Sequence, residues 1–330
     1  MTHGPKRKRK PSRWRFLRAA ADQALAVFLS GLVRVLNWTL LPVNHFYGTV
    51  AGLFLCVFGK NVKRITRTNL AIAFPDLNED ERAKLAKKSI LELGKTMSEL
   101  GPAWCGSKRR LLSLVTEVHG EDIVQQAMQD GRGVLVLGPH FGAWEIAGMY
   151  LSIKYDILGL YRRPRVAALE SLTRRARVRF GATMVPADMS GVRAICKALR
   201  QKKIVGILPD QDPGDSGGVN APFFGRPVRT MLLASRLAAK SGCLVVYCVA
   251  ERLPRGAGYR VHFREAHPDI ASANDLTAAT AINEGIESII EIDPAQYLWS
   301  YKRYRANAQA PVNPYKRNRP KPNEPLRRAA

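Results

Sequence analysis

The sequence predicts an α/β fold, in which helices cover a β-sheet. Short apolar runs alternate along the chain with longer segments of helical character, which is the pattern of this fold class. The clearest run, residues 134–137, is bounded by glycines, short and partly β-branched, as is typical of a buried strand. With 330 residues, the chain is long enough for one large domain of this class and an appendage.

The expected elements follow one another in a regular order. One helix ends at Pro75, and the next begins at 78–80 and runs through Glu99. Strands are expected at 114–118, 134–137, 157–161, 183–185, 204–208, 244–250 and 259–263. Helices are expected at 120–130, 143–150, 192–201, 230–241 and 277–292.

The chain is strongly basic. It contains 52 lysine and arginine residues against 27 aspartate and glutamate residues, a formal net charge of +25. Such an excess implies an anionic partner, which could be nucleic acid, an anionic lipid surface or an acidic substrate. Several cations form an arginine cluster after the strand expected at 157–161: Arg162, Arg163, Arg165, Arg174, Arg175, Arg177 and Arg179. Few acidic residues interleave with this cluster, which favours binding of phosphates or of an acidic protein over a solvated helix face.

The five cysteines are scattered and odd in number: Cys56, Cys105, Cys196, Cys243 and Cys248. They show no zinc-ligand spacing, and the last two fall in an apolar strand-like run. We therefore interpret them as reduced, buried thiols, which places the main domain in the cytosol.

The N-terminal region predicts attachment to a membrane. Residues 1–18 form a basic arm without acidic residues, and residues 19–60 form a mostly apolar segment that Arg34, Pro42 and other residues interrupt. No uninterrupted apolar run reaches the roughly 20 residues of a clean span, and no cleavage site of a signal peptide is found. The alternative is that the arm is only a solvated tail.

The basic arm also bears on topology. Because it is more basic than the residues that follow the apolar segment, the positive-inside rule places the N-terminus in the cytoplasm. A helix or helical hairpin inserted from the cytoplasmic side would keep the main domain in that compartment, and a true span of reversed orientation is the alternative.

His140 and Glu145 are the expected catalytic residues. The strand at 134–137 is stopped by Gly138 and Pro139, so His140 should lie at the carboxyl edge of the sheet, where open α/β sheets bind ligands. With Glu145 in the first turn of the next helix, its carboxylate can reach one imidazole nitrogen and leave the other to take a proton from a substrate hydroxyl. The alternative is a satisfied histidine at a helix start beside an unrelated glutamate.

Asp210 and Asp212 follow the strand expected at 204–208, again at the carboxyl edge. They could hydrogen-bond substrate or pair with the arginine cluster. Two acidic ligands without a nearby histidine are too few for a metal site, so no metal is expected.

In combination, these segments resemble the bacterial lipid A late acyltransferases, the lauroyl and myristoyl transferase group. The likeness covers most of the chain and follows, in order, the motifs NLAIAFPDL, GPHFGAWEIAG, LPDQDPG, PFFG and QYLWSYKRYR. Each motif alone is weak, but their order is quite specific. The resemblance implies a mixed, mostly parallel sheet flanked by helices, as in glycerol-3-phosphate acyltransferases, with an N-terminal membrane helix.

The resemblance also implies a reaction. The donor would be a fatty acyl thioester on acyl carrier protein, and the acceptor a hydroxyl of a phosphorylated glucosamine lipid, the lipid A precursor. No cofactor is implied, and the enzyme would lie at the bacterial inner membrane with its catalytic domain on the cytoplasmic side. The family's His-x4-Asp/Glu motif falls on His140 and Glu145. The expected substrate-binding residues are Arg162, Arg177, Arg179, Asp210, Phe224 and Gly225.

Two further segments have two interpretations each. The aromatic turn 222–226, which includes Phe224 and Gly225, could form a wall of an acyl pocket or only pack as a loop. The segment 296–305 mixes aromatic and basic residues and could seat lipid headgroups or stack nucleic-acid bases. The family often has His-Arg-Arg-Phe after the QYxW element, where this chain has SYKRY, a difference that bears on the acceptor.

Two other functions stay open. One is acylation of another membrane lipid, such as a lysophospholipid or an amino-acid lipid. The other is nucleic-acid binding without catalysis, which the net charge suggests although no nucleic-acid-binding motif is recognised. The expected domains are a basic cytoplasmic arm (1–18), a membrane-associated helical segment (19–60), an α/β acyltransferase domain (61–305) and a basic, disordered tail (306–330).

Overall fold

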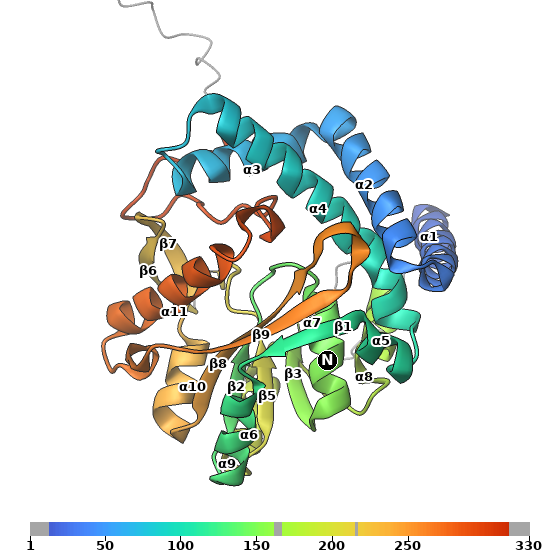
Figure 1. The fold of residues 1–330 in the computed structure, drawn as a ribbon. Helices are drawn as coiled ribbons and strands as arrows, with labels where there is room; N and C mark the ends of the chain where they lie inside the picture. Colours follow the sequence, from blue (N-terminus) through green and yellow to red (C-terminus); the bar gives the residue numbers. More distant parts are fainter. Residues whose placement is uncertain (1–12, 162–166, 215–216, 317–330) are drawn as a thin grey trace, which may run out of the picture.

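The fold is built around a seven-stranded sheet covered by helices (Figure 1). The computed structural model describes residues 13–161, 167–214 and 217–316. The strand order is β1-β9-β8-β2-β5-β3-β4, and every neighbouring pair is parallel except β8 and β9. The expected mixed, mostly parallel sheet is confirmed. Its strands are β1 (Val115–His119), β2 (Val134–Leu137), β3 (Ile157–Tyr161), β4 (Thr183–Pro186), β5 (Ile204–Ile207), β8 (Leu244–Arg252) and β9 (Tyr259–Glu265).

The helices cover both faces of the sheet and cross above one end of it. In Figure 1, α3 and α4 lie above the sheet, at the end opposite to α6, α9 and α10. Helix α4 begins with a capping box, in which Asn78 and Glu81 each accept a hydrogen bond from the other's backbone nitrogen. The helices of this domain are α3 (Lys60–Ala73), α4 (Glu79–Cys105), α5 (Lys108–Leu114), α6 (Glu121–Gln129), α7 (Trp144–Lys154), α8 (Ala167–Val178), α9 (Met189–Arg200), α10 (Leu233–Ser241) and α11 (Asp275–Ile290).

Strand β2 lies at the centre of the sheet, between β8 and β5. Val134 and Val136 pack in the core beneath α7, whereas Leu135 and Leu137 pack in the core on the opposite face. Burial on both faces explains why this strand is a continuous apolar run rather than an alternating one.

A separate hairpin of β6 (Gly218–Phe223) and β7 (Arg226–Met231) is missing from the expected elements. The helix expected from residue 230 starts later, because its first residues belong to β7. The two turn residues, Phe224 and Gly225, have φ angles of 47° and 71°, as the tight turn of a hairpin requires. Prolines at both ends of the turn hide the strand pattern, since proline is excluded from central strands but tolerated in an edge ribbon.

The two N-terminal helices, α1 (Arg13–Trp38) and α2 (Leu41–Phe58), precede this domain. Helix α2 packs closely on α4 where glycines face each other. A Cβ added at Gly94 would lie only 2.1 Å from the carbonyl oxygen of Gly48. Their other sides expose large apolar side chains: Leu25, Val27, Phe28, Leu32, Val35 and Trp38 of α1, and Val43, Phe46, Tyr47, Val50, Leu53, Phe54, Val57 and Phe58 of α2.

Within the described ranges, α2 is the one helix that is long and apolar enough to cross a membrane, by length and composition only. The core helix of a soluble protein can pass the same test, but such a helix is mostly buried, whereas only 28% of α2 is buried.

The packed chain continues past the expected domain boundary at residue 305. Tyr315 is buried, and its hydroxyl donates to Asn69 Oδ1 at 2.5 Å while accepting from the backbone nitrogen of Tyr304 at 3.0 Å. The first part of the expected tail is therefore docked on the domain. Residues 317–330 lie outside the described residues.

Candidate functional site

His140 and Asp210 meet at the carboxyl edge of the sheet. Strands β2 and β5 are parallel neighbours in which Leu137 pairs with Ile207, and each functional residue lies three positions further along its own chain segment. The register therefore brings the two turns together. The imidazole Nδ1 of His140 lies 2.7 Å from Asp210 Oδ1, and its backbone nitrogen donates to Oδ2 at 2.9 Å.

This contact defines the chemistry of the imidazole. A carboxylate at Nδ1 holds the proton there, so Nε2 is left as the basic nitrogen. The amide nitrogen of Gln211 lies 3.3 Å from Nε2. The His140 side chain keeps 13% of its surface exposed, whereas that of Asp210 keeps 3%. The pair can therefore act as a general base toward a molecule that enters from the His140 side.

The charge of Asp210 is fixed by its surroundings. Burial alone would raise the pKa of this carboxyl group, but His140 outweighs burial through its charge and two hydrogen bonds, and the positive charge of Arg303 adds to the effect. The pKa of Asp210 therefore lies below its ordinary value. Burial and the nearby Asp210 carboxylate raise the pKa of Tyr297 well above its ordinary value, so this phenol stays protonated.

Glu145 does not make the expected contact with the imidazole; that expectation is wrong, and Asp210 occupies the position instead. Glu145 lies in the first turn of α7 and accepts a hydrogen bond from Trp104 Nε1 at 2.9 Å. It also accepts from Arg177, through Nε at 3.3 Å and through Nη2. The physical reason is that α7 begins only at Trp144, so its first turn directs this carboxylate toward α4 and α8.

Glu145 is nevertheless electrostatically linked to His140. Burial would raise the pKa of this carboxyl group, but the charge and hydrogen bonds of Arg177, the indole of Trp104 and the charge of His140 together lower it. Glu145 is therefore a buried anion near the imidazole, although the imidazole donates to another carboxylate.

An apolar cavity of about 110 Å³ opens next to these residues. It lies between α7 and the strands β2, β5, β3 and β4, and its polar end includes Glu145 and Arg177. Trp144 also lines it and packs edge-on against the His140 ring, with 5.2 Å between ring centroids. The site thus joins a basic nitrogen, a buried ion pair and an apolar chamber. Among the described residues, no three His, Cys, Asp or Glu side chains gather as a metal-binding group.

Comparison with known proteins identifies the family. The family model described as bacterial lipid A biosynthesis acyltransferase matches residues 11–306. The chain belongs to this family. The resemblance drawn from the sequence motifs is thereby confirmed, and the chain is an acyltransferase of the lipid A biosynthesis group.

Relatives of the acyltransferase differ in the acyl chain for which they are named. The chain is 28% identical to the lipid A biosynthesis lauroyltransferase of Escherichia coli (strain K12) over 277 residues, 83% of this chain and 89% of that protein. It is 31% identical to the palmitoleoyltransferase of the same strain over 268 residues, 80% and 85% of the two chains. It is 23% identical to the myristoyltransferase over 267 residues, 81% and 82% of the two chains.

The expected substrate-binding residues of the acyltransferase separate in the structure. Arg177 joins the site through Glu145, whereas Arg162 lies outside the described residues. Arg179 donates to the carbonyl oxygen of Ala103 at 2.9 Å and stacks over Phe180, so it has a structural contact elsewhere.

The expected pocket wall at Phe224 and Gly225 is also elsewhere. Phe224 packs against Phe74 and Trp299, with ring centroids 5.3 and 5.9 Å apart, and the two turn residues are not among the described residues that line the apolar cavity. Of the two interpretations of this turn, loop packing fits the structure, because the two residues form the tight turn between β6 and β7.

The segment 296–305 supports the turn that carries His140 through backbone hydrogen bonds. The backbone nitrogen of Gly142 donates to the carbonyl of Gln296 at 3.0 Å, and the nitrogen of Leu298 donates to the carbonyl of His140 at 3.0 Å. The suggested role in seating headgroups or stacking bases is wrong for its buried side chains, which are Gln296, Tyr297, Trp299, Arg303 and Tyr304.

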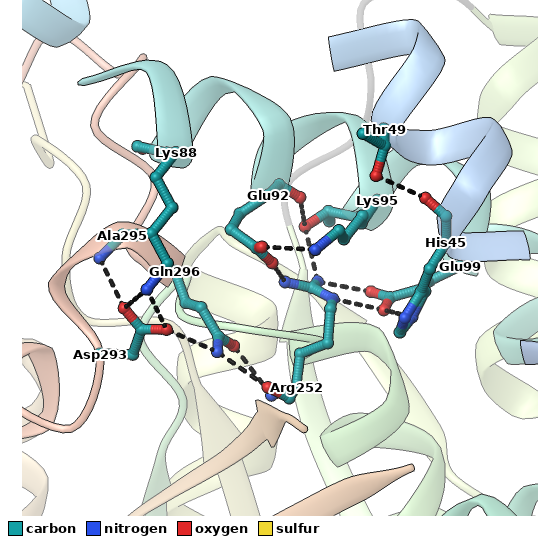
Figure 2. A network of polar contacts seen from close by, with 12 residues as sticks. His45, Thr49, Lys88, Glu92, Lys95, Glu99, Arg252, Asp293, Ala295 and Gln296 are labelled. Atoms are coloured by element: carbon teal, nitrogen blue, oxygen red, sulfur yellow. Dashed lines mark hydrogen bonds and ion pairs between the residues drawn. The ribbon is translucent and has the colours of Figure 1, made fainter. Parts of the chain in front are cut away.

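A buried ion-pair network, which sequence reasoning missed, extends from this segment to α2 (Figure 2). Arg252, at the end of β8, donates to Glu99 at 2.5 and 2.6 Å and to Glu92 at 2.6 Å. His45 Nε2 of α2 lies 2.7 Å from Glu99, and the Gln296 amide exchanges two hydrogen bonds with the Arg252 backbone, at 2.8 and 3.0 Å. One signal was available: Glu92 and Glu99 are seven residues apart, which places both on one helix face.

The ion pairs set the charge of this network. Burial would raise the pKa of Glu99, but the Arg252 guanidinium and then His45 outweigh burial and lower the pKa to about 2. Glu99 is therefore a buried carboxylate whose charge depends on its partners.

Proposed function

We propose that the protein transfers a fatty acyl chain from acyl carrier protein to a hydroxyl group of a lipid A precursor, as a late acylation step, with His140 as the general base. The observation that carries this proposal is the 2.7 Å contact between His140 Nδ1 and Asp210 Oδ1, at the sheet edge beside the apolar cavity. It leaves Nε2 as the nitrogen that accepts the proton of a hydroxyl group.

The proposed reaction is a direct transfer. Nε2 of His140 takes the proton of the acceptor hydroxyl as its oxygen attacks the thioester carbonyl. The carbon–sulfur bond then breaks, and the leaving thiolate receives the proton from Nε2. The acceptor hydroxyl would take the place of the Gln211 amide, which now lies 3.3 Å from Nε2. Asp210 holds the proton on Nδ1 and stabilises the imidazolium that forms.

Glu145 and Arg177 have a supporting role in this proposal. The Glu145 carboxylate adds a second negative charge near the imidazolium, since the charge of His140 helps to lower the pKa of Glu145. Arg177 uses Nε and Nη2 to bind Glu145. A guanidinium has five donors in a planar fork, which suits a phosphate group or the developing oxyanion. Arg162 stays a prediction as a second phosphate-binding residue.

The membrane is the proposed location of the acceptor. The exposed apolar faces of α1 and α2 would lie in the cytoplasmic leaflet of the inner membrane, and the basic arm would bind its anionic lipids. Because α2 also packs against α4 through its glycines, a helical hairpin lying in one leaflet fits better than a helix that crosses the bilayer alone.

The direct test is His140→Ala in the full chain. We expect acyl transfer from acyl carrier protein to a tetra- or penta-acylated precursor to fall by roughly 10²–10⁴-fold, the usual contribution of a positioned general base. Binding to anionic vesicles should be unchanged, because His140 is not part of the exposed apolar faces of α1 and α2. Normal turnover by this variant would contradict the proposed role of His140.

Acylation of another membrane lipid is the second candidate, because the same base could serve a different hydroxyl. Mass spectrometry of lipid A from a deletion strain separates the two: a missing acyl chain supports the lipid A acceptor, and an unchanged acyl count supports the alternative. Membership of the acyltransferase family favours either enzyme over a nucleic-acid-binding protein without catalysis.

A further inference from the structure

The apolar cavity runs from the catalytic edge into the domain along α7. Near the site it is lined by Trp144, Glu145 and Arg177, and farther along the helix by Gly148 and Ser152. From Glu145 to Ser152 the helix advances by about 10 Å, or two turns. The chamber is therefore mostly apolar and extends along two turns of α7, and the Glu145–Arg177 ion pair borders it.

Gly148 lies in the middle of α7 and has no packing reason to be glycine. A Cβ added there would meet nothing within 4 Å, and its φ angle is not in the left-handed region. Other glycines of the chain contrast with it: at Gly191, for example, a Cβ would lie 1.9 Å from the carbonyl oxygen of Pro186. Glycine within a helix lowers stability relative to alanine. The helix therefore loses stability at Gly148 without any gain in packing.

The space that Gly148 leaves open belongs to the cavity. We propose that the cavity holds the acyl chain of the thioester, and that the missing side chain at Gly148 sets how long a chain fits. This inference rests on the proposed function, because it takes the fatty acyl thioester as the substrate. It fits the relatives, whose printed names differ in the length of the chain transferred.

The lining beyond Gly148 suits such a ligand. Met149 and Met184 border the cavity, and methionine side chains adapt to irregular apolar shapes. A leucine at position 148 would project into the chamber only three residues, about 4.5 Å of helix, beyond Glu145. The inner part of the chamber would then be closed to a long chain but not to a short one.

The test compares donors of different length on one enzyme. The full chain, in anionic vesicles that contain the lipid A precursor, is given acyl carrier thioesters from octanoyl to palmitoyl. We expect Gly148→Leu to lower kcat/KM most for the longest chain that the natural enzyme accepts well. This decrease should be at least tenfold larger than the decrease in kcat/KM for octanoyl. Gly148→Ala should give a smaller shift in the same direction, since each methylene buried contributes about fourfold in affinity.

Gly31→Leu is the matched control. Gly31 is also helical, and a Cβ there also meets nothing within 4 Å, but it lies in α1 away from the cavity. It should keep the natural preference for chain length. Both leucine variants should fold, because leucine is a better helix former than glycine, and thermal unfolding verifies this.

The outcomes are distinct. A shift toward shorter chains in the Gly148 variants alone supports the inference. An unchanged profile, or an equal loss for all chain lengths, overturns it while leaving the proposed function intact. Absence of transfer by the natural enzyme from any of these thioesters overturns the proposed function, and the inference with it.

Discussion

Arg177 on α8 is paired with Glu145 on α7 in the wall of the apolar cavity, and the side chain of Glu145 is almost fully buried. Burial alone would lower the pKa of this arginine, but the Glu145 carboxylate raises it. Each residue thus keeps the other charged. The sequence motif that contains Glu145 therefore contributes an ion pair to the site rather than a direct contact with the histidine.

The ion pair should be visible in a double-mutant cycle. Glu145→Ala leaves the guanidinium and the Trp104 indole without their acceptor, and we expect a loss of about 1–3 kcal/mol in the free energy of unfolding. Arg177→Ala should have an effect of similar size, and the double variant should lose less than the sum of the two. Chemical denaturation of the four proteins measures this coupling. Additive effects would show that the two charges do not depend on each other.

Asp210 and His140 should act as one unit in catalysis. Asp210→Ala removes the acceptor at Nδ1, so the imidazole loses both its orientation and the charge that stabilises the imidazolium. We expect kcat to fall by on the order of 10²-fold or more. The variant lacking both side chains should be no slower than His140→Ala alone, because residues that act together are not additive. A further loss in the double variant would assign Asp210 a separate role.

The free energy of unfolding should fall steeply in acid because of Glu99. Its pKa is about 2 in the folded protein, whereas a glutamate in an unfolded chain titrates near about 4.3. As the pH falls, the unfolded chain binds the proton first. The stabilisation is therefore present above about pH 4 and is lost as the pH falls toward 2.

Glu99→Gln should lower the free energy of unfolding at neutral pH and flatten its decline in acid. Glu284→Gln, an exposed position on α11, is the control and should leave the acid limb unchanged. Denaturation midpoints measured from pH 6 to about pH 3 compare the three proteins. If stability declined equally with falling pH in all three proteins, Glu99 would not be the cause of the acid sensitivity.

Arg252 should be the most sensitive position of the buried network. Arg252→Met removes the buried cation that Glu99 and Glu92 share, although Lys95 stays paired with Glu92 at 2.6 Å. Removing one partner of a buried ion pair typically costs about 3–5 kcal/mol. Adding Glu99→Gln to that variant should recover part of the loss, because one uncompensated charge is removed. Arg236→Met, at an exposed arginine, should change little. Thermal unfolding of the natural protein and these three variants gives the order of their stabilities.

The exposed face of α2 should determine membrane binding. Phe54 is 60% exposed on this face, and Phe54→Glu would place a charge where the proposal places lipid. We expect at least tenfold weaker binding to anionic vesicles. Leu276→Glu, at an equally apolar exposed position on α11, should bind as the natural protein does. Co-sedimentation with vesicles compares them, and equal binding of both variants would place the membrane contact elsewhere.

The sheet was largely predictable, because buried parallel strands leave a clear apolar signature. The run 134–137 became β2 with the expected bounds. The β6–β7 hairpin was not predictable, because its two strands pair only with each other and the prolines beside its turn interrupt the strand pattern. A local apolar pattern can specify a strand that is buried on both faces of a sheet. It cannot specify a strand of a two-stranded hairpin, which pairs on one edge only.

The site was predicted in its parts but not in its pairing. His140 and Asp210 were both expected at a strand's carboxyl edge, yet their contact depends on β2 and β5 being neighbours, which no local pattern contains. Nearness in sequence favours Glu145 as the partner of His140, but the partner in the fold comes from the neighbouring strand segment. The Arg252 network brings together side chains from positions 45, 99 and 252, and only the folded chain reveals it.

The network in Figure 2 has a consequence for how the protein would meet its acceptor. From His45 through Glu99 and Arg252 to Gln296, buried polar groups join α2 directly to the segment that supports the His140 turn. When α2 rests in a leaflet as proposed, the imidazole is held at one height above the lipid tails. The protein would thus select its acceptor by depth in the membrane as well as by shape. It would acylate hydroxyl groups at that level of the headgroup layer and not those that lie higher or lower.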